Sequence, residues 1–151
     1  MRIGIDARLA YRRGVGTYSA NLVLALSRVD PYNDYWIFGA PTELKKAVTN
    51  RRFRFSDPQT ESESRFARRW ESHPAWYEQF WLPSRLFKYE LDLLHYTDNS
   101  ATMARDIPYV VTVHDTLFLR PLTEAYPRAT LKQKMLDLYK KLLVPSTARH
   151  A

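Results

Sequence analysis

Segments with strand character alternate along this chain with segments whose apolar residues have helical spacing. The strands are predicted from short apolar or β-branched runs at residues 2–7, 34–39, 52–56, 91–97 and 108–115. Helical spacing and breaker residues predict helices at residues 17–28, 41–50, 74–90 and 127–143. This alternation predicts an α/β fold with a mostly parallel sheet and helices on both faces.

Breakers and capping residues suggest where the helices begin and end. Asp30-Pro31 ends the first helix, Thr42 is a candidate N-cap of the second, and Pro83 bends or interrupts the third. The polar, aperiodic residues 57–72 predict the longest loop. We expect three aromatic residues of the third helix to lie in the core: Phe80, Trp81 and Phe87.

Two of the four glycines, Gly14 and Gly16, stand between the first predicted strand and the first predicted helix. A glycine loop that enters a helix is typical of an anion site. Its backbone N–H groups approach a phosphate closely, and the helix dipole adds partial positive charge. Thr17 is expected to cap the helix and donate a hydroxyl. The alternative is a tight turn in which glycine serves only to adopt a positive φ.

Three arginines lie close to this loop in the sequence: Arg8, Arg12 and Arg13. The planar donor fork of arginine suits phosphate, although a solvated basic loop is an equal alternative. The pattern departs from a dinucleotide fingerprint, because Ser19 stands at the third glycine position and no acidic residue ends the second strand. It is not a P-loop either, since no Gly-Lys-Ser/Thr follows.

Composition narrows the class of protein and of partner. The 151 residues amount to about one domain, and the net charge of +7 favours an anionic partner. The absence of cysteine excludes disulfides, thiolate catalysis and Cys-based zinc sites, and the four scattered histidines suggest no metal. We expect a cytoplasmic protein, because no signal peptide and no apolar run of about 18 residues is present. No nucleic-acid motif is found, so no nucleic-acid partner is expected.

Three segments together resemble the N-terminal domain of retaining glycosyltransferases of family 4, which have the GT-B fold. They are RIGIDARLAYRRGVGTYSANLVLAL (2–26), LDLLHYTDN (91–99) and PYVVTVHDTLFLRPLTEAYP (108–127). The resemblance covers nearly all of the chain, least clearly residues 40–75. It implies two Rossmann-like domains facing each other across a cleft, with this chain as the acceptor-side half. The implied activity is hexosyl transfer from a nucleotide sugar to a saccharide or lipid-linked acceptor, as in polysaccharide or glycolipid synthesis, without a metal.

The same resemblance implies roles for individual residues on the donor side. Gly14, Gly16 and Thr17 would contact the donor diphosphate and stabilise the leaving group electrostatically. His114, expected with Asp115 at the end of the strand 108–115, would be the catalytic histidine near the transferred sugar. A histidine that is merely satisfied in a strand-end turn is the alternative.

On the acceptor side, the resemblance points to residues at and just after the end of the strand 91–97. His95, Thr97 and Asn99, together with Arg12, would bind the acceptor, and Tyr96 and Asp98 could line the same pocket. A turn role for Asp98-Asn99 is equally open. Basic and aromatic residues in the following set would dock on a lipid-linked or membrane acceptor at the inner membrane face: Arg65, Arg68, Arg69, Trp70 and Trp76.

The chain also departs from the family, because its 151 residues hold no donor-binding domain. We therefore expect the chain alone to be inactive. The final LLVPSTARHA (142–151) resembles a helix end that leads into another strand, so the sheet is expected to lack its last strand. The exposed edge would favour self-association or a partner. Two alternatives stay open: a membrane-recruiting subunit of a split glycosyltransferase, and a nucleotide-binding Rossmann domain of an oxidoreductase.

Overall fold

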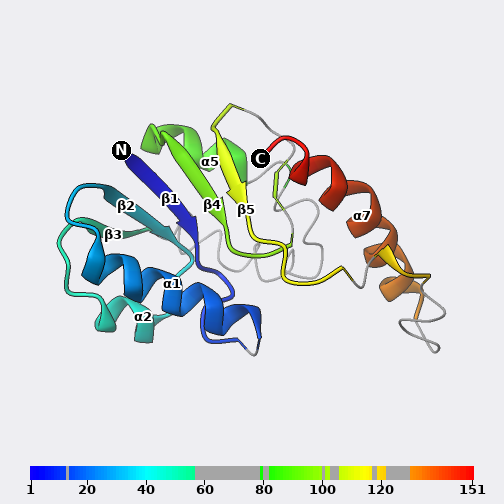
Figure 1. The fold of residues 1–151 in the computed structure, drawn as a ribbon, viewed down its shortest axis with the longest axis horizontal. Helices are drawn as coiled ribbons and strands as arrows, with labels where there is room; N and C mark the ends of the chain where they lie inside the picture. Colours follow the sequence, from blue (N-terminus) through cyan, green and yellow to red (C-terminus); the bar gives the residue numbers. More distant parts are fainter. Residues whose placement is uncertain are drawn as a thin grey trace.

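The computed structural model describes residues 1–12, 14–56, 79, 82–99, 101–102, 106–116, 119–121 and 130–151. Within these residues the chain forms one sheet of five parallel strands in the order β3-β2-β1-β4-β5 (Figure 1). The strands are β1 (Arg2–Asp6), β2 (Asp34–Phe38), β3 (Phe53–Ser56), β4 (Leu93–Tyr96) and β5 (Tyr109–Val111). The all-parallel sheet with its helices confirms the predicted Rossmann-like α/β class.

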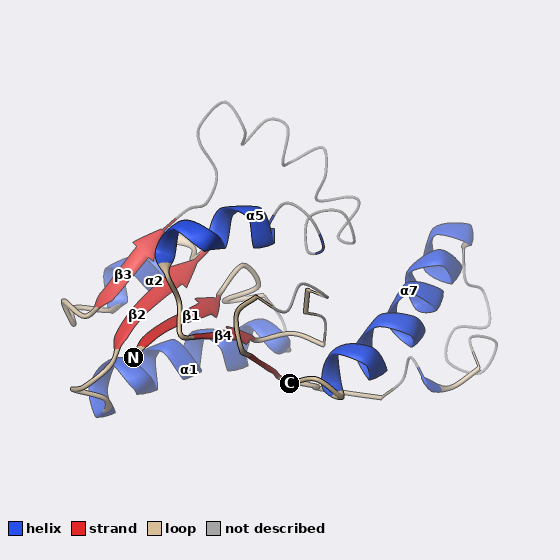
Figure 2. Ribbon diagram, turned by 90° about the horizontal axis from the view of Figure 1, so that it is seen from above, coloured by secondary structure: helices blue, strands red, loops and turns tan. Residues whose placement is uncertain are grey.

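Helices cover both faces of the sheet, as its all-parallel pairing requires (Figures 1 and 2). On one face, α1 (Val15–Val29) and α2 (Thr42–Ala47) pack over a core that includes Ile5, Val23 and Ile37. On the other, α5 (Leu82–Leu86) and the 3₁₀ helix η2 (Phe87–Tyr89) accompany a core built around Phe38, Leu86, Leu94 and Tyr96. Neighbouring residues of one strand, such as Ile37 and Phe38, enter opposite cores because strand side chains alternate.

The last helix, α7 (Leu131–Ala148), touches the sheet mainly through its C-terminal half. Its Leu143, Val144 and Thr147 are buried, and the Tyr109 hydroxyl of β5 donates a hydrogen bond of 3.0 Å to the Thr147 carbonyl. The N-terminal half lies away from the sheet in both ribbon views. Among the described residues, α7 is therefore held at its C-terminal end and near its middle, where the Gln79 side chain donates to the Tyr139 hydroxyl at 3.2 Å.

Several predicted element boundaries are corrected by the structure. The strand predicted at 108–115 ends at Val111, which pairs with Tyr96, the last residue of β4. A final ladder bond of 3.0 Å joins the Thr112 N–H to the Tyr96 carbonyl, and beyond it β4 offers no further partner residue. His114 and Asp115 consequently lie in the loop after β5 and not at the strand end.

The predicted caps are wrong for two helices. The N-cap of α1 is Gly14 and that of α2 is Pro41, and neither helix has a side-chain cap. Thr17 and Thr42 lie inside the first turns instead, where their side chains do not reach the N-cap position. The long helices are otherwise where the spacing predicts, since α1 extends the predicted 17–28 by two residues at its start and one at its end.

The last predicted helix, at 127–143, is shifted toward the C-terminus. It begins after Thr130, whose side chain and backbone form a reciprocal capping box with Gln133. It continues through Pro145 to Ala148, although a proline lacks the N–H that a helix interior uses. In this last turn the Thr147 hydroxyl donates to the Leu143 and Val144 carbonyls, and the Tyr109 hydroxyl of β5 donates to the Thr147 carbonyl.

The predicted third helix is described only in part. Its core residue is Leu86, which is buried, whereas Phe87 is 57% exposed and the prediction of a core position for it is wrong. The chain changes from α5 to the tighter η2 at this point, which turns Phe87 outward. The predicted loop 57–72 and the aromatic residues Trp76, Phe80 and Trp81 lie outside the described residues.

Candidate functional site

The strand order singles out one edge of the sheet. In an open α/β sheet, ligands bind outside the carboxyl ends of the strands at the point where the winding reverses. Here that point lies between β1 and β4, because α1 and α2 cover one face and α5 covers the other. Residues 7–12 and 14–18 follow the carboxyl end of β1, residues 97–99 that of β4 and residues 112–116 that of β5. We refer to these residues together as the carboxyl edge.

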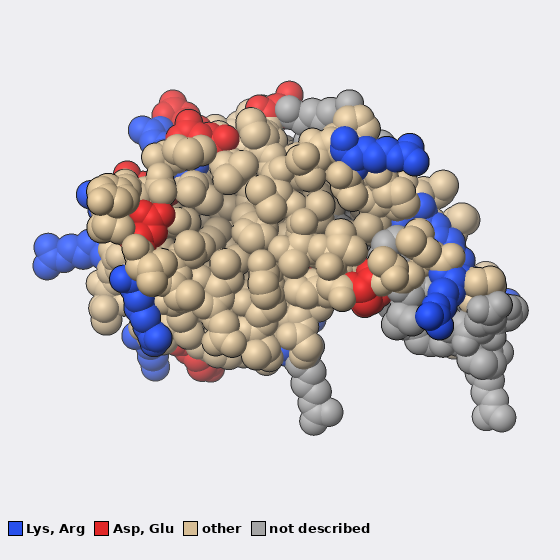
Figure 3. All heavy atoms as spheres, in the orientation of Figure 1, with Lys and Arg blue, Asp and Glu red and all other residues tan. Residues whose placement is uncertain are grey.

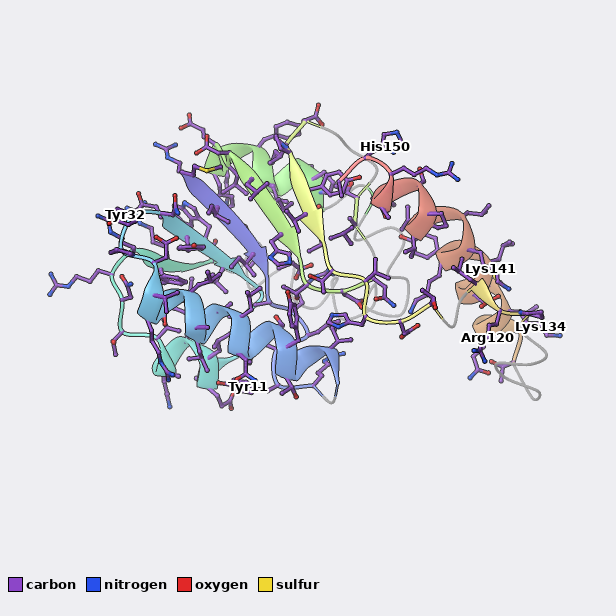
Figure 4. All side chains as sticks on the ribbon, viewed as in Figure 1. Tyr11, Tyr32, Arg120, Lys134, Lys141 and His150 are labelled. Atoms are coloured by element: carbon purple, nitrogen blue, oxygen red, sulfur yellow. The ribbon has the colours of Figure 1, made fainter. Side chains whose placement is uncertain are left out.

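The loop from β1 into α1 uses its two glycines for different reasons. Gly14, the N-cap, has φ 74° and ψ −107°, a conformation that side-chain-bearing residues rarely adopt. Gly16 is buried, and a Cβ at this position would overlap the Leu9 carbonyl oxygen. The Tyr11 N–H donates to the Gly16 carbonyl over 3.0 Å, which holds the loop against the first turn of the helix. Tyr11, labelled in Figure 4, is itself exposed at the outer side of this loop.

The N-terminus of α1 is open toward solvent. Gly14 and Thr17 are exposed, no side chain caps the helix, and its first turn holds no acidic residue. Thr17 uses its backbone N–H to bond the Gly14 carbonyl at 3.0 Å. The helix itself therefore places no carboxylate at its positive end, which suits an anionic group.

The arginines near this loop have different surroundings. Arg8 forms a forked ion pair with Asp6, with Nε 2.8 Å from Oδ1 and Nη2 2.6 Å from Oδ2. Asp6 is buried at the end of β1, so this pair stabilises the strand end and the loop that follows it. Arg12 is exposed, and Arg13 lies outside the described residues.

His114 is held in place by two residues that follow β4. Its backbone N–H donates to the Asn99 Oδ1 at 2.6 Å, and its Nε2 lies 2.8 Å from the Thr97 carbonyl oxygen. A carbonyl only accepts, so Nε2 carries a proton and Nδ1 is the ring nitrogen left to meet a ligand. Asn99 and Thr97 are buried, and the Thr97 hydroxyl donates to the Asp6 carbonyl at 2.7 Å. These contacts join the carboxyl ends of β1, β4 and β5 into one unit.

His95 belongs to a second polar group on the α1 side of the same edge. Its Nε2 lies 2.8 Å from the Thr112 hydroxyl, which lies 3.2 Å from the Tyr18 hydroxyl of α1. Burial lowers the pKa of His95 below the usual value for histidine, so its ring is neutral near pH 7. The Tyr18 ring meets the His114 ring edge-on with centroids 5.1 Å apart, which connects this group to the first.

The structure therefore brings most of the sequence-predicted site residues to one edge of the sheet. His114 is hydrogen-bonded to Thr97 and Asn99, and His95 is linked to it through Thr112 and Tyr18. Asp115 is exposed beside His114, and Arg12 is exposed on the glycine loop. Tyr18 and Thr112 were missed. In the sequence, Tyr18 has the spacing of an apolar residue of an amphipathic helix. Its position in the first turn of the helix that follows β1 is the signal that could have placed it at the carboxyl edge.

Other features of the described residues offer weaker sites. A mainly apolar hollow lies on the face of the sheet opposite α1 and α2. Its lining includes Leu86, Leu94 and Tyr109, and it brings few polar groups together. No cluster of three potential metal-ligating side chains occurs within the described part of the chain. Among the same residues, no helix is both long and apolar enough to cross a bilayer.

Comparisons of this chain with known protein families, with curated proteins and with solved structures found no match.

Proposed function

We propose that this chain is the acceptor-side half of a GT-B glycosyltransferase, which moves a sugar from a nucleotide-sugar donor to a saccharide or lipid-linked acceptor. One observation carries the proposal: the open, glycine-capped N-terminus of α1 lies beside His114, through the 5.1 Å contact of Tyr18. A helix end suited to an anion and a histidine thus lie close together, which supports transfer from a sugar diphosphate.

In the proposed reaction, the bond between the sugar and the diphosphate breaks and negative charge develops on the diphosphate oxygens. The acceptor hydroxyl oxygen forms the new bond to the sugar, and its proton passes to the departing diphosphate. The N–H groups and dipole of the α1 N-terminus stabilise that charge in a fixed orientation. His114 presents Nδ1 to the sugar while its Nε2 proton is held by the Thr97 carbonyl, so the imidazole keeps one orientation during the reaction. A donor-binding domain, on the same or a separate polypeptide, supplies the contacts to the nucleoside.

The oxidoreductase alternative has less support from the same residues. Ser19 stands at the third glycine position of the dinucleotide fingerprint and is fully buried. The chain leaves β2 through Gly39 and Ala40, so no acidic side chain follows that strand to bind a ribose hydroxyl. The split-transferase alternative differs only in where the donor domain resides, and co-purification of a second polypeptide would distinguish it.

The proposal is tested by nucleotide titration of the ¹⁵N-labelled chain. UDP-glucose, GDP-mannose and NAD⁺ are added separately, and the amide shifts of residues 14–17 are followed by NMR. We expect one of the nucleotide sugars to shift these amides with a Kd on the order of millimolar, because a single helix end provides few contacts.

A matched pair of variants makes this titration specific. Thr17→Glu places a negative charge in the exposed first turn of α1, and Asn21→Glu places the same charge one turn later on the exposed face. We expect Thr17→Glu to weaken binding several-fold and Asn21→Glu to leave it nearly unchanged, because the helix-end effect falls off within one turn. Stronger shifts with NAD⁺ than with either nucleotide sugar would favour the oxidoreductase, and equal effects of both variants would contradict a site at the helix end.

A further inference from the structure

A row of large apolar side chains is exposed along α7. Leu131, Met135, Leu138 and Leu142 are between 58% and 75% exposed. Their spacing of four, three and four residues places them within an arc of about 60° on a helix of 3.6 residues per turn. We call these four residues the α7 stripe. Isolated exposed leucines are ordinary, but four apolar side chains in one row form a continuous apolar surface. Such surfaces are typical of sites that contact another protein or a membrane.

The charge around the α7 stripe is strongly positive. Residues 131–151 contain five Lys and Arg (Lys132, Lys134, Lys140, Lys141 and Arg149) and one acid, Asp137, so they hold four of the seven net positive charges. Lys134 and Lys141 follow one border of the stripe, and Figure 4 labels both along α7, with Lys134 near the end that lies away from the sheet. Figure 3 likewise shows lysine and arginine side chains over α7, beside a broad uncharged surface. Asp137 is engaged by Lys141 at 2.7 Å.

We propose that the α7 stripe docks this protein on an anionic lipid bilayer surface. Narrow apolar rows bordered by lysine are what an interfacial helix uses, with the apolar side chains among the acyl chains and the ammonium groups at the phosphates. Each lysine near an anionic surface adds attraction that falls off within a Debye length. The half of α7 that carries Leu131 to Leu138 lies away from the sheet, which leaves it accessible to a flat surface.

Charge argues against a second copy of the chain as the partner of this surface. Two α7 stripes facing each other would bring the rows of Lys134 and Lys141 close together, and like charges beside an apolar seam oppose pairing. The stripe also spans only about two heptads, whereas a coiled coil needs three or four to be sustained. Neither objection applies to an anionic bilayer. It carries charge opposite to that of the lysines, and it can receive an apolar row of about two heptads.

The test is co-sedimentation of the intact chain with vesicles. Phosphatidylcholine vesicles are compared with vesicles in which about one third of the lipid is phosphatidylglycerol. We expect binding to the anionic vesicles at least about tenfold tighter than to phosphatidylcholine alone, and mostly lost in about 0.5 M NaCl. The double variant Leu138→Ser/Leu142→Ser should weaken binding about tenfold or more, because it removes half of the inserted apolar side chains.

Matched controls separate the stripe from general surface properties. Val29→Ser removes an apolar side chain that is 72% exposed on α1, and it should not alter binding. Lys134→Glu should weaken binding several-fold, whereas Lys46→Glu, the same charge change at an exposed site on α2, should have a much smaller effect. Circular dichroism confirms that each variant is folded.

Three results would overturn the proposal. The first is unchanged vesicle binding by the double serine variant, which would place the membrane contact elsewhere, for example in the basic and aromatic segment 65–76. The second is the same loss of binding with Lys46→Glu as with Lys134→Glu, which would indicate net charge alone. The third is the absence of vesicle binding together with a dimer that the serine variant dissociates, which would make the stripe a protein interface. The inference goes beyond the proposed sugar transfer and involves no nucleotide, so its failure leaves the nucleotide titration untouched.

Discussion

At the residue scale, Gly14 and Gly16 stand two positions apart but meet different constraints. Gly14 has open space where a Cβ would point, and its constraint is the backbone conformation at φ 74°. Gly16 has an ordinary helical backbone, and its constraint is the Leu9 carbonyl that a Cβ would overlap. Gly14 and Gly16, which suggest phosphate binding in the sequence, therefore also have structural functions.

The two glycines should respond differently to alanine. Gly16→Ala forces the loop away from α1 and should lower the free energy of unfolding by roughly 1–3 kcal/mol or more, as overpacking does. Gly14→Ala should cost about 1–2 kcal/mol through backbone strain alone. Urea denaturation measures both values, and in amide spectra Gly16→Ala should disturb residues 9–12 more than Gly14→Ala does. A larger loss of stability with Gly14→Ala than with Gly16→Ala would contradict the assignment of constraints.

His95 should make the stability of the protein depend on pH. Because burial lowers its pKa in the folded state, the unfolded chain binds a proton more readily than the folded chain at and below pH 6.5. The free energy of unfolding should therefore fall as pH is lowered from 6.5 toward the folded-state pKa. His95→Gln keeps a polar side chain near Thr112 and should reduce this dependence. Urea titrations of both proteins at pH 7.5 and 5.5 measure the difference, and parallel losses in the two would contradict the prediction.

At the scale of elements, α7 has two halves with different support. The first half carries the exposed residues Leu131, Met135 and Leu138, whereas the second half contains the buried residues Leu143, Val144 and Thr147. Local opening requires little energy where few apolar contacts must break. The first half therefore depends mainly on its capping box, whereas the second half has buried side chains and the Tyr109 bond to the Thr147 carbonyl.

This difference predicts the hydrogen-exchange pattern of α7. Amides of residues 134–141 should exchange faster than those of 143–148. Thr130→Ala removes the cap and should weaken the helix by about 1 kcal/mol, with faster exchange confined to the first half. Tyr109→Phe removes the bond to the Thr147 carbonyl and should act on the second half instead. Mass spectrometry of deuterated peptides measures both effects, and a uniform change along α7 in either variant would count against two separately held halves.

The predicted elements differ in how well the sequence specified them. The strands β1 to β4 and the helix α1 follow from apolar periodicity and breakers, which are local signals. The end of β5 could not be predicted from local signals. The run PYVVTV keeps the pattern of a strand beyond Val111, but β4 ends at Tyr96, so the later residues of the run have no strand to pair with. The caps also failed as predictions, since Thr17 and Thr42 are good capping residues that the chain places one to three positions too late.

At the scale of the whole molecule, the sheet ends in β5 on one side and in β3 on the other. Val110 of β5 is 42% exposed on the face that carries α1, so no described helix fully covers this edge. An exposed edge strand offers unpaired backbone groups to another chain. The sequence-based expectation of self-association thus remains a prediction, and β5 is the place where it should occur.

That prediction can be tested by sedimentation velocity. We expect association that increases between about 5 and 100 μM, and we expect Val110→Lys to reduce it, because a charged residue on an edge strand opposes pairing. Lys46→Glu on α2 serves as a control with an altered net charge. A wild-type chain that stays monomeric over the whole concentration range would contradict self-association through the β5 edge.

The sequence by itself determined the class of fold, because the periods of its apolar residues and its breakers define strands and helices locally. It also determined that chemistry-bearing residues lie at or after the carboxyl ends of the strands, since Gly14, His95 and His114 can be placed there by counting. Only the tertiary structure decided which of these residues meet. The pairing of β4 with β5 and the packing of α1 bring Tyr18, His95 and Thr112 together across long stretches of chain. Such contacts depend on register and packing between distant segments, which no local pattern encodes.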